Sequence, residues 1–475
     1  MRTLVWFRGK DLRLADHAPL ADALAHGELV PLFVLDPYFF APERARELPH
    51  RMQFLLESLA ELEANVRNLG SRLLVVPGKS VDVVPELAHR FGVDRVVAQR
   101  WSEPFARERD RRVALALHVP FVAFEGETLH PPGTLRTRQG TPYTVFTPFS
   151  RAFAAEARVA TPLEAPRALP PLPRDIACET VPVPTCDMLG IRRNPALLAG
   201  GERAARRRLD RFLEGPARSY DVTRDRLDLA GSSRLSQDLK FGTLSPRAVW
   251  AAVTRALARK APNALRSFRN ELVWREFTHS TLWDFPDVLS APFRPAWRDF
   301  PFHEDEAGLD AWRRGATGYP VVDAAARQLL AEGFVPNRAR MIAASFLTKH
   351  LLVDYRRGEA HYLKWLTDGD WAQNNAGFQW SAGSGMDAQP YFRIFNPVTQ
   401  GEKFDPEGAW VRRWVPELAR LPAKFVHAPF LAPKAVLAAA GVRLGETYPE
   451  PVVEHSSART RFLVIAETHL GRTRG

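Results

Sequence analysis

The chain has 475 residues, which is too long for one ordinary hydrophobic core and predicts two or three domains. Hydrophobic residues make up 45% and charged residues 25%, a balance typical of a globular protein that folds in water. The net charge of +11 and the pI near 9.9 favour a polyanionic partner such as nucleic acid, although an arginine-rich genome gives the same charge.

Membrane spans, disulfide frameworks and metal centres are not expected from the sequence. No run of about 18 apolar residues occurs, and the opening MRTLVWFRGKDLRL becomes charged too soon for a secretion signal. The two cysteines, Cys178 and Cys186, are too few for a disulfide framework or a zinc site, and no histidine pair has ligand spacing. We therefore expect a cytoplasmic protein without a bound metal.

The first 125 residues alternate between short apolar runs and amphipathic stretches, which predicts five buried strands and the helices between them. This alternation is typical of an α/β domain with a Rossmann-like parallel sheet, although no G-x-G-x-x-G motif follows the first strand. Ligands of such sheets bind beyond the carboxyl ends of the strands, so Asp36 and the loop after Gln99 are candidate site positions. The expected strands are 3–8, 29–36, 71–78, 94–101 and 119–126, and the expected helices are 50–70, 80–92 and 104–117.

Helical periodicity dominates the second half of the chain, after a proline-rich connector. Eight prolines lie between residues 160 and 198, which predicts a connector that wraps over the surface. No alternating strand pattern follows, so the second half predicts an all-helical domain, with amphipathic helices at 247–260, 268–283, 321–334 and 338–357. The predicted domains are an α/β domain at 1–130, the connector at 131–199 and the helical domain at 200–475.

Several clusters in the helical half are richer in polar and aromatic side chains than a core or a plain surface requires. The stretch GSSRLS, residues 231–236, offers hydroxyl and backbone N–H groups that suit a phosphate, although a helix cap has the same pattern. Glu271 and Trp274 in NELVWREF share one helical face, as do Asn337 and Met341 in NRARM. Each pair is also compatible with a capped or salt-bridged helix surface.

Taken together, these clusters resemble motifs of the DNA photolyase and cryptochrome family. The similar stretches cover nearly the whole chain in the family's order: LVWFRGKDLRL, SRLSQDLKFGTLSPR, NELVWREF, TGYPVVDAAARQL, NRARMIAASFLTK, DGDWAQNNAGFQW and YFRIFNPVTQGEKFD. The resemblance is greatest to a class I cyclobutane pyrimidine dimer photolyase. It implies an N-terminal antenna domain, a helical domain that holds a U-shaped FAD, and repair of ultraviolet-damaged pyrimidines by light-driven electron transfer.

The resemblance implies FAD contacts residue by residue. Arg340 matches the arginine that pairs with Asp368, and a cation near the ring favours the anionic reduced flavin. Asn374 matches the residue opposite flavin N5, where plant cryptochromes have aspartate, and a neutral amide there favours repair. The full set of implied FAD contacts is Tyr220, Ser232, Ser233, Arg234, Leu235, Ser236, Asn337, Arg340, Asp368, Gly369, Asp370 and Asn374.

The resemblance also implies a pocket for a pyrimidine dimer that is flipped out of the duplex. Trp274 and Trp380 match indoles that stack on the flipped bases, and Glu271 matches a carboxylate that hydrogen-bonds the dimer. Members that repair (6-4) photoproducts have histidines at the positions of Asn337 and Met341, so this chain predicts specificity for cyclobutane dimers. The implied catalytic residues are Glu271, Trp274, Asn337, Met341, Asn374 and Trp380, and the implied DNA contacts are Arg224, Glu271, Trp274, Arg338 and Trp380.

Three positions depart from the family pattern. The tryptophans that commonly carry electrons to oxidised flavin align with Phe302, Tyr355 and Phe378, and phenylalanine is far too hard to oxidise for this role. We expect repair by pre-reduced flavin to persist, and photoreduction to be slow or to follow another route. Trp371, one residue past Asp370, is a candidate for that route, although simple packing explains it slightly better.

The antenna chromophore is expected to be 8-hydroxydeazaflavin or a flavin rather than folate, unless the pocket is empty. Folate-binding members carry an Asn–Glu pair where this chain has Phe105 and Ala106. The opening WFRGKDLR also has one residue more than the family motif, which shifts Gly9 and Lys10 and leaves first-loop contacts unassigned.

Two other functions remain open on the sequence alone. A cryptochrome-like blue-light photoreceptor is the first, but the missing tryptophans would disable its usual photoreduction. A nucleotide-binding α/β protein with a helical appendage is the second, but it leaves GSSRLS, NRARM and DGD unexplained. The expected partner is ultraviolet-damaged DNA, and the expected state is a monomer.

Overall fold

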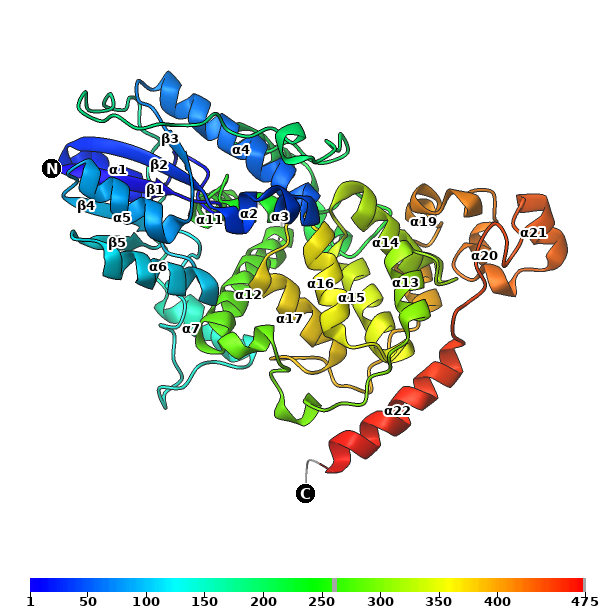
Figure 1. Cartoon of the computed structure of the whole chain (residues 1–475). Helices are drawn as coiled ribbons and strands as arrows, with labels where there is room; N and C mark the ends of the chain where they lie inside the picture. The colour runs from blue at the N-terminus through cyan, green and yellow to red at the C-terminus, as the bar shows by residue number, and fades with distance from the viewer. Residues whose placement is uncertain (259–262, 473–475) are drawn as a thin grey trace. The chain divides into compact units, whose positions relative to one another are not determined.

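A computed structural model describes residues 1–258 and 263–472, which form two compact units (Figure 1). Unit 1 comprises residues 1–218, 233–286 and 367–369, and unit 2 comprises residues 219–232, 287–366 and 370–475. The domain boundaries expected from the sequence, at residues 130 and 199, are not tested by this division and stay a prediction.

A five-stranded parallel sheet forms the centre of unit 1, in the order β3-β2-β1-β4-β5. The order reverses at β1, and the chain leaves β1 and β4 at the same edge, which is where ligands of such sheets bind. The strands are β1 Arg2–Phe7, β2 Glu28–Leu35, β3 Leu74–Pro77, β4 Arg95–Gln99 and β5 Phe121–Phe124, so all five predicted strands are confirmed.

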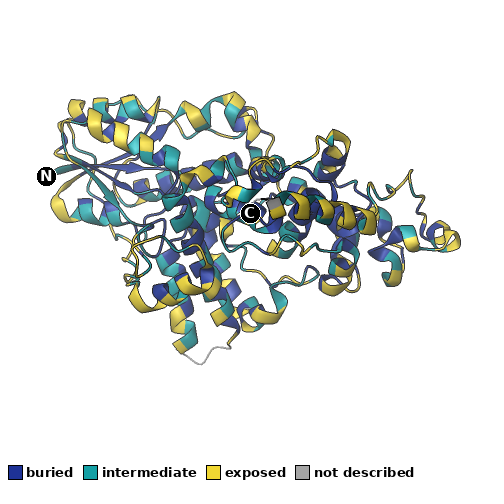
Figure 2. Cartoon of the chain, turned by 90° about the horizontal axis from the view of Figure 1, so that it is seen from below, coloured by how far each residue is buried: buried dark blue, intermediate teal, exposed yellow. Residues whose placement is uncertain are grey.

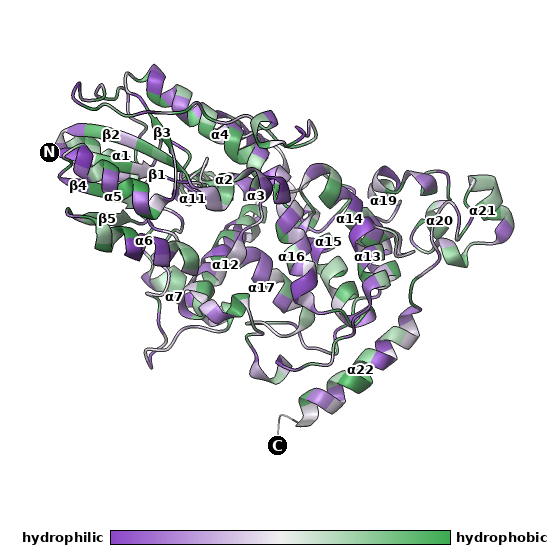
Figure 3. Ribbon diagram, in the orientation of Figure 1, coloured by the Kyte–Doolittle hydropathy of each residue, from purple (hydrophilic) through white to green (hydrophobic). Residues whose placement is uncertain are grey.

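Two layers of helices cover the sheet because successive side chains of a strand point to opposite faces. Val5 and Phe7 belong to the cluster that includes α1 and α4, whereas Leu4 and Trp6 belong to the cluster that includes α5 and α6. The central strands β1, β2 and β4 are mostly buried and apolar, the edge strand β5 is half-buried, and exposed polar residues lie on the outer faces of the helices (Figure 2, Figure 3). These helices are α1 Ala18–His26, α4 Pro49–Asn68, α5 Ser80–Arg90 and α6 Pro104–Ala116, and the last three confirm the predicted helices.

The proline-rich segment belongs to unit 1, and backbone hydrogen bonds join it to the rest of that unit. The backbone N–H of Leu169 donates to the carbonyl of Leu69 at 2.7 Å, and that of Val181 donates to Val75 at 3.0 Å. Both cysteines are free thiols. The other helices that begin in unit 1 are α2 Pro37–Phe40, α3 Pro42–Glu47, α7 Phe146–Glu156, η1 Asp187–Leu189, α8 Glu202–Glu214, η2 Pro216–Ser219, α10 Ser236–Phe241, α11 Pro246–Ala258 and α12 Ala264–Asp284.

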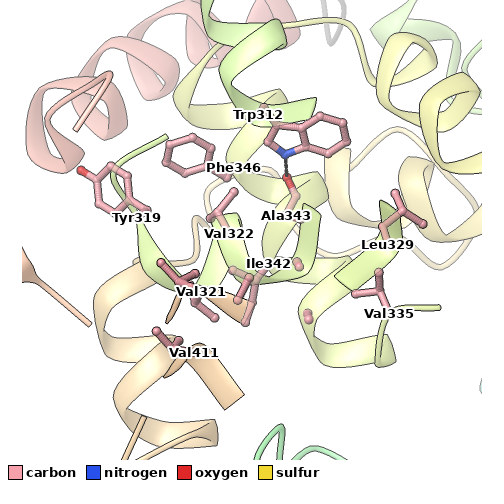
Figure 4. Close-up of a cluster of buried hydrophobic side chains, with 14 of the residues drawn as sticks. Trp312, Tyr319, Val321, Val322, Leu329, Val335, Ile342, Ala343, Phe346 and Val411 are labelled. Atoms are coloured by element: carbon pink, nitrogen blue, oxygen red, sulfur yellow. Dashed lines mark hydrogen bonds between the residues drawn. The ribbon is translucent and has the colours of Figure 1, made fainter. Parts of the chain in front are cut away.

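Unit 2 is built from helices around an apolar core, part of which is drawn in Figure 4. Trp312 is 1% exposed, and its indole N–H donates to the carbonyl of Ala343 at 2.9 Å, which satisfies its polar atom inside the core. The helices are α9 Tyr220–Thr223, η3 Pro286–Leu289, η4 Pro295–Trp297, α13 Glu306–Arg314, α14 Pro320–Glu332, α15 Asn337–Ser345, η5 Phe346–His350, α16 Tyr355–Trp365, α17 Trp371–Ala382, α18 Pro397–Phe404, α19 Ala409–Trp414, η6 Pro416–Leu418, α20 Ala423–Val426, η7 Pro429–Leu431, α21 Lys434–Ala440 and α22 His455–Arg472. Within the described ranges, no helix is both long and apolar enough to span a bilayer.

The single helix predicted at 338–357 is wrong in its second half. α15 ends at Ser345, a π-helical turn follows at Phe346–His350, and Leu352 then adopts a left-handed φ of 57°. The side chain of Asp354 caps the next helix, α16. Apolar residues continue through the break, so periodicity does not reveal it. The helix predicted at 247–260 is α11 up to Ala258, and its last two residues lie outside the described residues.

Candidate active site

The motif NELVWREF lies in the middle of α12 in unit 1. Glu271 and Trp274 are one turn apart and both half-buried. The indole of Trp274 stacks on the phenyl ring of Phe146, with centroids 3.7 Å apart and planes 6° from parallel. Phe277 meets both rings steeply, at 5.8 Å from Trp274 and 6.0 Å from Phe146. One face of the indole is therefore covered, and a flat ligand can reach only the other face.

Glu276 fastens α12 to the loop after β5, a role that the sequence analysis missed. Its Oε2 accepts hydrogen bonds from the backbone N–H groups of Leu129 at 2.9 Å and His130 at 3.2 Å. Burial raises the pKa of the Glu276 carboxyl to about 7, because desolvation outweighs the opposing effects of Arg275 and the two N–H groups. The only sequence signal was a second glutamate in NELVWREF, five residues after Glu271 and on another face of the helix.

The GSSRLS stretch forms a tight turn that leads into α10. Arg234 has a φ of 53°, which is uncommon for a residue with a side chain, and the side-chain amide of Gln237 donates to the Arg234 carbonyl at 2.6 Å. Ser233 Oγ accepts the N–H of Leu235 at 3.4 Å, and Ser236 is exposed. The turn thus gathers hydroxyl and guanidinium groups, as a phosphate site requires.

Asp368 and Gly369 also belong to unit 1, in the short segment 367–369, although the chain before and after this segment belongs to unit 2. Asp368 is 7% exposed, and the carbonyl of Gly369 accepts a hydrogen bond from Arg51 Nη1 at 3.2 Å. The first aspartate of DGDWAQNNAGFQW is therefore held in place by unit 1.

The candidate residues nearest the start of unit 2 lie on or next to α9. Tyr220 is buried, and the guanidinium of Arg224 lies 5.6 Å from the centre of its ring. A Cβ at Gly231 would lie 2.6 Å from Thr223 Oγ1, so this position of GSSRLS accepts only glycine. Ser232, which follows it, is exposed.

The motif NRARM begins α15. Asn337 Nδ2 lies 3.6 Å from Met341 Sδ, so the two residues predicted to discriminate between lesions are in contact. Arg338 forms an ion pair with Asp225 at 2.7 Å. Arg340 Nε donates to a backbone carbonyl of the preceding loop at 2.7 Å. These partners fix the direction in which each polar side chain leaves the helix.

The motif DGDWAQNNAGFQW continues as α17. The Asp370 side chain caps the helix by accepting an N–H of its first turn at 3.1 Å. Asn374 is 8% exposed, and its Nδ2 donates to the backbone carbonyl of Glu359 at 3.0 Å. Asn375 Nδ2 lies 3.1 Å from each carboxylate oxygen of the same glutamate. Trp380, six residues after Asn374 on the same helix, is half-buried.

Glu359 is a second buried carboxyl that no motif in the sequence marked. It lies on α16 and is 7% exposed. Burial raises the pKa of Glu359 to about 7, and the hydrogen bond from Asn375 lowers it by less. Its protonation state near neutral pH therefore bears on the helix that carries Asn374.

The candidate residues divide between the two units. Unit 1 contains Ser233, Arg234, Leu235, Ser236, Glu271, Trp274, Asp368 and Gly369, and unit 2 contains Tyr220, Arg224, Ser232, Asn337, Arg338, Arg340, Met341, Asp370, Asn374 and Trp380. Within unit 2, α15 packs against α17, which brings the NRARM helix and the Asn374 helix together. The pairing of Arg340 with Asp368 involves both units and stays a prediction.

The three positions aligned with tryptophans differ in their surroundings within unit 2. Phe378 is 4% exposed and meets the ring of Tyr362 edge-on, with centroids 5.2 Å apart. Tyr355 is 1% exposed and, with Phe302, lines a cavity of about 1010 Å³. Trp371 is half-buried in the first turn of α17. Its role in electron transfer stays a prediction.

Charged and aromatic side chains fill the carboxyl edge of the sheet in unit 1. Trp101, just after β4, has the guanidinium of Arg8 5.2 Å and that of Arg109 4.8 Å from the centre of its ring. Lys10 is 2% exposed and forms an ion pair with the buried carboxylate of Glu103. The extra residue in the first loop is thus accommodated by a buried charge pair.

Asp36, at this edge, binds the N-termini of two helices, α2 and α5. Its carboxylate accepts N–H groups from Tyr38 at 3.0 Å and Ser80 at 2.8 Å, which is a structural role. Phe105 stacks near Tyr38, with centroids 5.8 Å apart, and Ala106 is fully buried. The identity of an antenna chromophore stays a prediction.

Comparisons with known proteins agree with this arrangement. The family model described as DNA photolyase matches residues 3–170, and the model described as the FAD binding domain of DNA photolyase matches residues 268–468. A relative named deoxyribodipyrimidine photo-lyase from Agrobacterium fabrum is 40% identical over 470 residues, 97% of this chain and 96% of the relative. A relative of the same name from Thermus thermophilus is 41% identical over 466 residues, 98% of each chain.

Solved structures show the same likeness. A bacterial class III photolyase from Agrobacterium tumefaciens superposes with a TM-score of 0.92 at 38% identity, covering 98% of this chain and 97% of the other. A cryptochrome from Synechocystis superposes with a TM-score of 0.89 at 30% identity, covering 98% and 99%. The chain therefore belongs to the DNA photolyase family, and its C-terminal part is the FAD-binding domain of that family.

Proposed function

We propose that the protein is a deoxyribodipyrimidine photo-lyase that repairs cyclobutane pyrimidine dimers in DNA under near-ultraviolet or blue light. The observation that carries this proposal is the half-buried indole of Trp274, which is covered on one face by Phe146 and shares a helical face with Glu271. A flipped pyrimidine can stack on the other face of the indole while the Glu271 carboxyl reaches its polar edge.

The side chains of the motifs fit FAD as the cofactor. The exposed hydroxyls of Ser232 and Ser236 and the turn at Arg234 suit its phosphates. The Nδ2 atom of Asn374 donates to Glu359, which leaves Oδ1 as an acceptor for the N–H that reduced flavin carries at N5. When bound, reduced FAD supplies the electron that light drives into the dimer.

Asn337 and Met341 support a cyclobutane dimer as the substrate. They contact each other at 3.6 Å, and neither side chain gains or loses a proton near neutral pH. Splitting the two carbon–carbon bonds of a cyclobutane ring returns both bases without transfer of any substituent, so it needs no acid at this position.

For the antenna, we propose 8-hydroxydeazaflavin or a flavin. Phe105 and Ala106 offer no amide or carboxylate where folate-binding members carry an Asn–Glu pair. Heat extraction of purified protein followed by absorption spectroscopy tests this proposal, and a pterin in the extract would contradict it.

A cryptochrome-like photoreceptor is the second candidate, because the Synechocystis cryptochrome superposes over nearly the whole chain. The aromatic positions argue against it, since Phe302 and Phe378 cannot carry the electrons that reduce a signalling flavin. Light-driven flavin reduction at a rate ordinary for a photoreceptor would favour this candidate.

A repair assay separates the two functions. Chemically reduced, FAD-loaded protein is mixed with ultraviolet-irradiated oligo(dT), and recovery of thymine absorbance is followed under blue light, with a dark control. We expect recovery only in the light. No recovery from protein that holds reduced flavin would reject repair and leave the photoreceptor.

A further inference from the structure

The stack between Phe146 and Trp274 is unusually close for two aromatic side chains. Aromatic pairs usually meet offset or edge-on, with centroids 4.5–7 Å apart. Here the centroids are 3.7 Å apart and the planes differ by 6°, so the rings overlap almost completely. Phe146 is 7% exposed, whereas Trp274 is half-buried, so the pair presents the indole and hides the phenyl ring.

Phe146 is itself held rigidly. It is the first residue of α7, whose Phe149 packs against Phe277 of α12, with centroids 5.3 Å apart. The loop before α7 is tied to the end of α12 by a two-pronged ion pair between Arg136 and Asp284, with both N···O distances 2.8 Å. The phenyl ring is thus fixed relative to α12 from both sides.

The same loop leaves little room for movement at Trp283. Gly133 has a φ of 78°, and a Cβ there would lie 2.4 Å from the Trp283 ring. The guanidinium of Arg107 also lies 4.0 Å from the centre of that ring and donates to the Trp283 carbonyl at 3.0 Å. The loop and the helix therefore move together, and the Phe146 ring keeps its place beneath Trp274.

We propose that Phe146 is a positioning residue that sets the plane of the Trp274 indole before DNA binds. This inference rests on the proposed function of Trp274 as the stacking platform for a flipped base. An indole free to change rotamer would have to be ordered during binding, and the ordering entropy would be subtracted from the stacking energy. With Phe146 in place the ordering is already done, and only the face opposite the phenyl ring is offered to the lesion.

The test compares Phe146→Leu with Phe149→Leu in the FAD-loaded protein. Both variants remove one ring from the same aromatic cluster, but the ring contacts of Phe149 are with Tyr143, Phe153 and Phe277. We expect Phe146→Leu to weaken binding to dimer-containing oligonucleotide about two- to tenfold. Binding to undamaged DNA and the repair yield at saturating DNA should not change. Phe149→Leu keeps the Phe146 ring and the Arg136–Asp284 ion pair, so its loss of lesion affinity should be clearly smaller than that of Phe146→Leu, with the other two quantities unchanged.

Phe146→Met serves as a second variant should Phe146→Leu fold poorly, because a flexible thioether fills the volume without fixing the indole. Unchanged affinity for the lesion in a folded Phe146 variant would overturn the proposal. Equal losses in Phe146→Leu and Phe149→Leu would also overturn it, since they would indicate a general packing effect. Trp274→Ala separates this failure from that of the proposed function: if it leaves lesion affinity unchanged, Trp274 is not the platform.

Discussion

The side-chain amide of Asn374 donates a hydrogen bond to the backbone carbonyl oxygen of Glu359, with a distance of 3.0 Å. The next residue, Asn375, donates to the Glu359 carboxylate at 3.1 Å. Two consecutive amides of α17 are therefore bound to one residue of α16. Because that residue is buried, a proton gained or lost by its carboxyl acts on the helix that carries Asn374.

Replacing Glu359 by glutamine should change how stability depends on pH. The pKa of Glu359 is raised to about 7, so between about pH 4.5 and 7 the folded protein binds more protons at this site than the unfolded chain. The contribution of Glu359 to the free energy of unfolding therefore falls as the pH rises, by at most about 1.4 kcal/mol per pH unit. Urea unfolding of wild type and Glu359→Gln across this window measures the difference between their free energies of unfolding. Other titrating groups contribute equally to both proteins and cancel in this difference.

Glu306→Gln is the matched control, because Glu306 is exposed and its pKa is lowered by Arg357. Its difference from wild type should stay nearly constant above about pH 5. A constant difference for Glu359→Gln as well would contradict the raised pKa.

Glu276→Ala should destabilise the folded protein by about 1–3 kcal/mol. The substitution leaves the N–H groups of Leu129 and His130 without their acceptor, and such groups are costly to leave unpaired in a buried site. Thermal unfolding of the FAD-loaded protein measures the loss. Glu108→Ala, which removes an exposed partner of Arg111, should leave thermal unfolding nearly unchanged. Equal effects of the two substitutions would remove the fastening role of Glu276.

Asp225→Asn should strengthen binding to DNA. The carboxylate of Asp225 pairs with Arg338 at 2.7 Å and offsets the charge that this arginine would offer to a phosphate. Releasing the guanidinium should raise the dependence of log Kd on log salt by up to about 0.9, the change expected for one further phosphate contact. Fluorescence anisotropy with labelled duplex at several salt concentrations measures it, and the gain should vanish in the Asp225→Asn, Arg338→Ala double variant. A gain that persists without Arg338 would show that the arginine does not contact DNA.

Trp371→Phe should slow light-driven reduction of oxidised FAD if this indole replaces the missing tryptophans. Trp371 lies in the first turn of α17, three residues before Asn374, and phenylalanine keeps the packing while removing the oxidisable ring. Photoreduction is followed by flavin absorbance, with Trp365→Phe on α16 as the control. An unchanged rate in Trp371→Phe takes this residue out of the route.

Local sequence patterns predict the helices and strands of this chain better than they predict the contacts between its side chains. Strands 3–8 and 94–101 are predictable because apolar β-branched runs alternate with amphipathic helices. The break after His350 is not, since apolar residues continue through the π-helical turn and into Leu351 and Leu352. Glu276 and Glu359 escape prediction because a buried carboxyl and a surface carboxyl look alike in sequence, and their partners are far away along the chain.

The candidate site shows the same division. The helix predicted at 268–283 carries Trp274, and the structure has it there, whereas the sequence patterns predict no helix for Asn374, which lies on α17. Phe146 lies outside every motif and 128 positions before Trp274, so nothing in the sequence connects the two rings. Contacts of this kind depend on how α7 and α12 pack, which local patterns do not encode.

The three positions that align with tryptophans differ in how easily a tryptophan could be introduced, because a cavity lies beside Phe302 and Tyr355. A larger ring at either position has adjoining space of about 1010 Å³ into which it can extend. Phe378 has no such room, because a Cβ on the neighbouring Gly358 would already lie 2.7 Å from its ring, and overfilling a packed core costs about 1–3 kcal/mol. Indoles can therefore be introduced singly at the first two positions, whereas the third requires compensating changes around it.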